Sequence, residues 1–112
     1  MSDTRSGVER IADERRRQIE VEKHSADHDD EYNGDEGLAI AAACYASPVP
    51  IYELRDRGWS KEFRDPWPWS EEDDKRPEPD ATVSDDDRIR LLEKAGALIA
   101  AEIDRLLRKK TV

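Results

Sequence analysis

The sequence is poor in cysteine and in long apolar runs, and these two absences exclude several classes of protein. No stretch approaches the roughly 20 apolar residues of a membrane span, and the first residues lack the apolar core of a signal peptide. The single cysteine, Cys44, cannot form an internal disulfide. A reducing compartment suits such a chain, so we predict a cytoplasmic protein that does not contact a membrane.

Basic residues are also scarce. Lys and Arg together number 19 against 28 Asp and Glu, which gives a formal net charge of −9. Affinity for phosphates needs clustered basic side chains, so this balance argues against direct binding to nucleic acid. A strongly acidic protein instead favours a protein partner with a basic surface.

Aliphatic side chains are the third shortage. Leu, Ile, Val and Phe supply 20 of the 112 residues, and charged residues reach 42%, against roughly 25% in ordinary domains. The aliphatic residues are nevertheless concentrated near 8–21, 38–54 and 89–107. This distribution predicts one small helical domain, 1–112, with a modest core and a flexible leader at 1–7.

The spacing of these residues predicts an all-α fold with three main helices, at about 8–23, 36–46 and 84–110. The first helix has one narrow apolar strip, formed by Val8, Ile11, the stem of Arg15, and Ile19. The second helix is mostly alanine, which allows a neighbouring helix to approach closely.

The third helix carries the clearest pattern. Ser84 followed by three aspartates is a good helix start, because a hydroxyl caps the first turn and acidic side chains favour the positive end of the helix dipole. Its main apolar stripe recurs at steps of three and four: Ile89, Leu92, Gly96, Ile99, Ile103 and Leu106. Leu91, Ala95 and Leu98 widen that stripe. The first helix offers too little apolar surface to cover it, so we predict a homo-dimer or a higher homo-oligomer.

A long irregular strap at 51–83 joins the second and third helices. Prolines end the second helix and, with Gly58, allow only a short helical turn at 52–55. Within the strap, Trp67-Pro68-Trp69 fixes two large rings in a defined geometry. These rings either anchor a partner or cover the helices, and the sequence favours the second role slightly.

Two acidic runs, 27–36 and 71–87, are the candidate contact surfaces. If the fold brings them together, they can imitate nucleic-acid phosphates and occupy a basic groove; otherwise they serve solubility alone. The predicted partner-binding residues are Asp27, Asp29, Asp30, Glu31, Asp35, Glu36, Trp67, Trp69, Glu71, Glu72, Asp73 and Asp74.

A metal site is an alternative interpretation of the first acidic run. His24 and His28 lie four residues apart beside several carboxylates, a pattern that suits a hard cation such as Mg²⁺. The candidate ligands are His28, Asp29, Asp30, Glu36 and Glu93. A solvated acidic loop explains the same residues without a metal, and we favour that interpretation, with no cofactor. Cys44 has no basic neighbour in sequence, so we predict that it packs in the interior.

The order of these features resembles small accessory proteins of tailed phages and prophages. The likeness covers most of the chain: Glu14-Arg15-Arg16-Arg17-Gln18, the turn Asn33-Gly34-Asp35-Glu36, the Ala-rich helix, Trp67-Pro68-Trp69, and the run from Leu91 to Ile103. The resemblance implies a phage accessory protein and supplies no activity.

More distantly, the first and last helices are similar to those of the all-α nucleoside triphosphate pyrophosphohydrolases, the MazG-like group. That group binds Mg²⁺ through acidic pairs three residues apart on two helices. Here Glu36 is followed three residues on by Ala39, and Glu93 is preceded three residues back by Arg90. The resemblance therefore implies a shared helical scaffold with degraded metal motifs.

The sequence identifies no reaction. We hypothesise a non-enzymatic, phage-type inhibitor, comparable to anti-CRISPR proteins, that binds a host defence or nucleic-acid-handling protein through its acidic surfaces. One alternative is a divergent MazG-like nucleotide-binding protein or pyrophosphohydrolase. Another is a sponge that sequesters a nucleotide signal, which needs basic residues such as Arg15, Arg16 or Arg88 turned inward.

Overall fold

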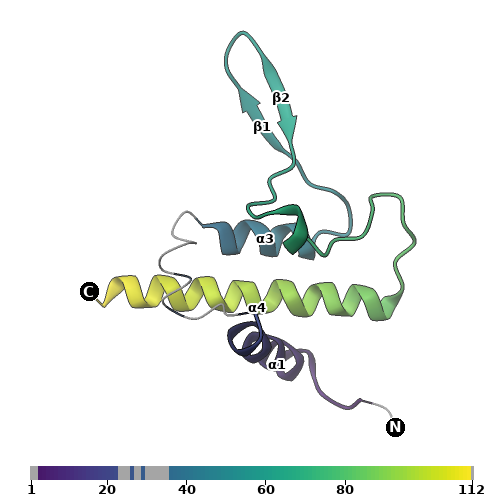
Figure 1. Ribbon diagram of the computed structural model, residues 1–112, viewed down its shortest axis with the longest axis vertical. Helices are drawn as coiled ribbons and strands as arrows, with labels where there is room; N and C mark the ends of the chain where they lie inside the picture. Colours follow the sequence, from purple (N-terminus) through teal and green to yellow (C-terminus); the bar gives the residue numbers. More distant parts are fainter. Residues whose placement is uncertain (1–2, 23–25, 27–28, 30–35, 112) are drawn as a thin grey trace.

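A long central helix organises the structure, a computed structural model that describes residues 3–22, 26, 29 and 36–111. This helix, α4 (Asp85–Lys110), packs along α3 (Gly37–Ala46) on one side, and α1 (Gly7–Glu20) crosses its other side (Figure 1). Strands β1 (Glu53–Asp56) and β2 (Lys61–Arg64) and the short 3-10 helix η1 (Glu71–Asp73) lie between α3 and α4 in the chain. The helices predicted at 8–23, 36–46 and 84–110 are thus confirmed, with small shifts at their ends.

The start of α4 follows the sequence signal. The Ser84 hydroxyl oxygen accepts a hydrogen bond of 3.1 Å from the backbone N–H of Asp87. Three acidic residues occupy the first turn and three basic residues the last turn, so both ends of the helix dipole are compensated. These terminal charges stabilise the ends of α4, whose 26 residues extend beyond the shorter helix α3.

The core lies between α3 and α4. Its buried side chains are Leu38, Ala41, Ala42, Tyr45, Leu91, Ala95, Leu98 and Ala101. Four of these eight residues are alanine, so the two helix backbones approach closely and the few large side chains fill the remaining space. Arg88 of α4 ties the end of α3 to this core, because its guanidinium donates hydrogen bonds to the carbonyls of Tyr45 and Ala46.

The contact between α1 and α4 differs from the prediction of an apolar strip. The buried residues of α1 are Glu14 and Gln18, whereas Val8 is 79% exposed and Ile19 is exposed as well. Basic side chains from both helices surround the buried carboxylate, and its charge is therefore compensated inside the protein. The prediction was wrong because apolar spacing alone does not reveal a polar interface of this kind.

Gly96 marks a close apolar approach of α1 to α4. A Cβ atom built at Gly96 would lie 2.6 Å from Cδ1 and 2.8 Å from Cγ1 of Ile11. Such distances require the isoleucine to move. The glycine is therefore needed for packing, although glycine inside a helix costs about 1 kcal/mol relative to alanine.

We expect Gly96→Ala to lower the free energy of unfolding when residue 11 is isoleucine and to raise it in an Ile11→Ala background. Overpacking costs roughly 1 to 3 kcal/mol, and it disappears when the larger side chain is removed, leaving the gain in helix propensity. Urea denaturation of the four proteins of this double-mutant cycle measures the coupling. Equal effects of Gly96→Ala in both backgrounds would contradict the contact.

The all-α prediction is wrong because the strap contains an antiparallel β-hairpin. β1 pairs with β2 in the register Glu53 with Arg64, Leu54 with Phe63, Arg55 with Glu62, and Asp56 with Lys61. The helical turn expected at 52–55 is strand instead. Three of the four pairs join opposite charges across the strands, and such pairs favour this register.

Candidate partner-binding surfaces

The hairpin projects away from the three helices as an arm, which we define as residues 53–64 (Figure 1). Every residue of both strands is exposed. A two-stranded hairpin is at best marginally stable in water unless it packs against something. We therefore expect the arm to be stabilised by a contact with something outside its own two strands.

The two faces of the arm differ in chemistry. Side chains alternate along a strand, so Leu54 and Phe63, which face each other in the register, lie on one face. The opposite face carries only charged residues: Glu53, Arg55, Glu62 and Arg64. Phe63 is 72% exposed, and Leu54 is exposed beside it. Asp56 and Lys61 lie on the same face as Leu54 and Phe63, so the arm presents one apolar cross-strand pair to solvent on a mixed face, backed by a face that is wholly charged.

The tip of the arm carries a third large apolar side chain. Gly58 has a φ of +82°, a conformation that an L side chain rarely adopts, and its N–H donates to the Asp56 carboxylate at 2.9 Å. The chain then closes through a hydrogen bond from the Arg57 N–H to the Ser60 carbonyl. This turn leaves Trp59 84% exposed, the most exposed large apolar residue of those described.

The strap beyond the arm is held down by aromatic contacts. The rings of Tyr45 and Trp67 meet edge-on at 5.3 Å, and those of Trp67 and Trp69 at 5.5 Å. Arg76 stacks on the ring of Trp67 and pairs with Asp65 at 2.8 Å. Trp67 and Trp69 therefore pack against the core between α3 and α4, which is the covering role that the sequence favoured.

The second acidic run lies next to this aromatic cluster. In η1, the Asp73 carbonyl accepts a hydrogen bond of 3.1 Å from the Tyr45 hydroxyl, so η1 lies against the C-terminal half of α3. Glu71, Glu72 and Asp73 are exposed, and Asp74 pairs with Arg76. Residues 65–87, which we call the acidic foot, contain ten acidic and two basic residues, a net charge of −8, and run from the base of the arm to the start of α4.

The first acidic run is not brought to the same place by its described members. Asp29 is fully buried, with its carboxylate 3.8 Å from Arg15, so it does not offer a surface contact. Glu36 is exposed at the N-terminus of α3, about 15 Å along the helix from the end that η1 contacts. The other predicted contact residues of this run, Asp27, Asp30, Glu31 and Asp35, lie outside the described residues.

The described metal candidates are engaged with arginines or lie apart. Glu93 pairs with Arg10 and with Arg90, at 3.0 and 3.1 Å, and Asp29 lies beside Arg15. Within residues 3–22, 26, 29 and 36–111, no group of three or more His, Cys, Asp or Glu side chains is arranged to hold a metal ion. His28 and Asp30 fall outside these residues.

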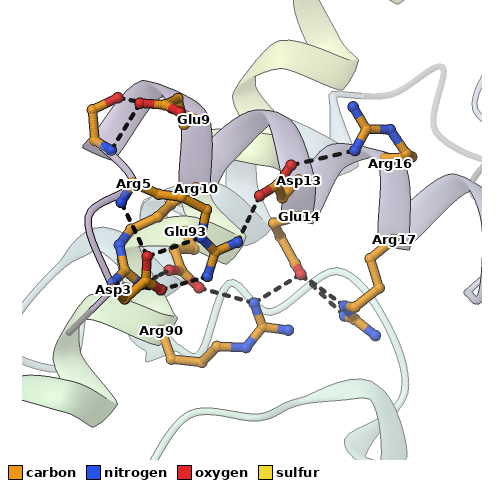
Figure 2. Close-up of polar contacts among 11 residues, drawn as sticks. Asp3, Arg5, Glu9, Arg10, Asp13, Glu14, Arg16, Arg17, Arg90 and Glu93 are labelled. Carbon is orange, nitrogen blue, oxygen red and sulfur yellow. Dashed lines mark hydrogen bonds and ion pairs between the residues drawn. The ribbon is translucent and has the colours of Figure 1, made fainter. Parts of the chain in front are cut away.

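Charged side chains fill the contact between α1 and α4 with a network that sequence reasoning missed (Figure 2). Glu14 is only 3% exposed and receives hydrogen bonds from Arg17, while Arg90 pairs with it at 2.7 Å. Burial alone would raise the pKa of this carboxyl, but the two arginines outweigh that effect and lower its pKa to about 2. Burial also lowers the pKa of Lys94, 3.9 Å away.

A crevice of about 570 Å³ opens between the end of α3, the strap and the start of α4. Its two arginines are occupied, because Arg76 pairs with Asp65 and Asp74 while Arg88 holds the α3 carbonyls. Burial raises the pKa of the Cys44 thiol at its wall, so this thiol has little nucleophilic character. Of the arginines named for a nucleotide sponge, Arg16 is exposed and pairs with Asp13. The crevice thus presents no cluster of basic groups for phosphates.

Comparison with known proteins returns no match to this chain among family models, curated proteins or solved structures. Within the described part of the chain, none of the helices has both the length and the apolar character that crossing a membrane requires.

Proposed function

We propose that this chain is a non-enzymatic binding protein that acts as an inhibitor by docking its arm, residues 53–64, on a host protein. The Leu54–Phe63 pair and the tip of the arm enter an apolar groove of the partner, and the acidic foot lies against basic residues beside that groove. The host origin of the partner follows from the resemblance to phage accessory proteins.

The exposed arm is the observation that supports this proposal. Exposed apolar surface on a segment that lacks packing of its own marks an interaction site more often than it marks a stable monomer surface. Tryptophan and other aromatic residues dominate the energetics of protein interfaces, and Trp59 and Phe63 are the most exposed aromatic side chains of the described residues.

The acidic foot gives the proposed interaction its dependence on salt. A net charge of −8 over residues 65–87 attracts a basic surface from a distance and raises the association rate. Screening acts within about 10 Å at 0.1 M salt, so added salt slows association while the apolar contacts of the arm persist. The contribution of the acidic foot can therefore be measured by its dependence on salt, and the contribution of the arm by the binding that remains at high salt.

The decisive experiment is affinity capture from host lysate with the wild-type chain and with the variant W59A/F63A. We expect the variant to lose the partner that the wild type retains, with binding at least about 30-fold weaker, because each ring belongs to the class of residues that anchor interfaces. The captured partner is then purified, and its affinity for both chains is measured by calorimetry at low and high salt.

V49A serves as the matched control, since Val49 is exposed and apolar but lies outside the arm. The control should retain wild-type affinity, and both variants should keep the wild-type melting temperature, because all three side chains are exposed. A partner that binds W59A/F63A as tightly as the wild type would refute the proposed role of the arm.

A further inference from the structure

One face of α4 remains uncovered by the rest of the described structure. Of the described elements, only α1 and α3 pack against α4. The apolar side chains on the remaining face are each between 41% and 55% exposed: Ile89, Leu92, Ile99, Ile103, Leu106 and Leu107. By helical geometry, this face lies roughly a third of a turn from each of the two covered faces, so another helix fits beside it.

Apart from Leu107, whose mirror position is Arg88, the residues of this face form with Gly96 a mirror image about the middle of the helix. Ile89 and Leu106 are equally far from a midpoint between Ala97 and Leu98. So are Leu92 and Ile103, and so are Gly96 and Ile99. The spacing alternates between three and four residues throughout, which is the pattern that packs one helix along another. If a second α4 ran antiparallel to the first, each position of the stripe on one helix would therefore lie opposite another position of the stripe on the other helix.

Charge selects the antiparallel orientation. Continuing the same spacing outward reaches Asp85 at one end of the stripe and Lys110 at the other, and both are exposed. These two positions are also equally far from the midpoint. Antiparallel pairing places each aspartate opposite a lysine of the second copy, whereas parallel pairing places like charges together.

At the centre of the face, the side chain of Ile11 from α1 fills the space beside Gly96. Gly96 has no side chain, and Ile11 of α1 lies over it, within 2.6 Å of where a Cβ would be. Ile11 is itself partly exposed, and Val8 one turn earlier on α1 is exposed too. The apolar face therefore widens from α4 onto α1 at the place where Ile99 of a second copy would dock.

We infer that two copies of this chain associate through this face, with their α4 helices antiparallel about a two-fold axis between Ala97 and Leu98. Such an interface is self-complementary, as a two-fold axis requires. The arm, residues 53–64, is not part of this contact, so each dimer presents two arms.

The variant I99E/I103E tests the face. We expect the wild type to sediment as a dimer and the variant as a monomer, with association at least about a hundredfold weaker, because four charges would be buried without partners. L54E is the matched control, since Leu54 is exposed to a similar degree on the arm, and it should remain dimeric. A wild-type monomer at all concentrations, or a dimer that tolerates I99E/I103E, would overturn the inference.

Disulfide trapping tests the orientation in the full chain. In the antiparallel pair, position 92 faces position 103 of the other copy, so L92C/I103C should form a covalent dimer on mild oxidation. L92C alone should not, because the two copies of position 92 lie about 16 Å apart, beyond the reach of a disulfide. The wild type, with Cys44 buried, is the background control. Trapping by L92C alone would indicate parallel helices and reject the proposed arrangement.

Discussion

Replacing Glu14 with glutamine is expected to lower the free energy of unfolding by about 3 kcal/mol at neutral pH. Removing one member of a buried ion pair leaves its partners without compensation and typically costs 3 to 5 kcal/mol. Here Arg17, Arg90 and Lys94 all lose the carboxylate that they share, but Arg17 keeps Glu22 and Arg90 keeps Glu93, so we expect a loss at the lower end of this range. Against a total stability of roughly 5 to 15 kcal/mol for a domain of ordinary stability, this loss is large. Urea denaturation of the wild type and of E14Q measures it.

The same carboxylate predicts a dependence on pH. The pKa of Glu14 falls from an ordinary 4.5 to about 2 on folding, so its contribution is complete above pH 4.5 and is lost as the pH falls toward 2. The stability difference between the wild type and E14Q should therefore shrink over this interval. Glu20 is an exposed glutamate on the same helix, and E20Q is the control. It should change the free energy of unfolding by no more than about 0.5 kcal/mol. A constant difference across the interval would contradict the assignment.

Leu38→Ala is expected to have a comparable effect through a different cause. Leu38 is fully buried between α3 and α4, and removing a buried leucine side chain costs about 2 to 5 kcal/mol. Its core neighbours include Ala41, Ala42 and Ala95, which are too short to move into the space. We therefore expect a cost near the upper half of this range.

Ile40→Ala provides the comparison, because Ile40 lies two residues away on α3 but is partly exposed. It should cost clearly less than Leu38→Ala in urea denaturation, with far-UV circular dichroism showing that both variants keep their helices. If the two variants lost equal stability, the core would not lie between α3 and α4 as described.

The helices were predictable from the sequence because their signals are local. Ser84 with the following aspartates predicts where α4 begins, and prolines 48 and 50 predict where α3 ends. The apolar pattern of α4 also predicted a broad interacting surface. The structure divides that surface, since Leu91, Ala95 and Leu98 are buried against α3 while the stripe from Ile89 to Leu106 is exposed.

The arm was not predictable in the same way. Its strands are four residues long, and charged side chains supply most of both strands, so neither strand shows the apolar alternation that identifies a half-buried strand. Gly58, which the sequence indicated as a chain breaker, is the turn residue of the hairpin. The available signal was the opposite charges at positions 53 and 64 and at positions 56 and 61. These pairs indicate a hairpin only when the register of the two strands is already known.

The buried Glu14 was missed because burial of a charge depends on residues far away in the chain. Arg90 lies 76 positions after Glu14, and nothing local to α1 indicates that the two meet. For the same reason, the sequence placed Asp29 on the surface, whereas it lies inside beside Arg15. Counting acidic residues therefore overstated the part of the surface that is available to a basic partner.

The hydrogen bonds of Arg88 have a consequence for how the chain can vary. They join the end of α3 to the start of α4, and Trp67 and Trp69 hold the strap on the core, so only the arm, residues 53–64, leaves the helical body. Lengthening or exchanging an excursion whose ends are already clasped costs little, because closing a loop depends only weakly on its length. The helices can therefore serve as a constant platform on which different hairpins are displayed, and new binding specificities can be engineered there without redesigning the core.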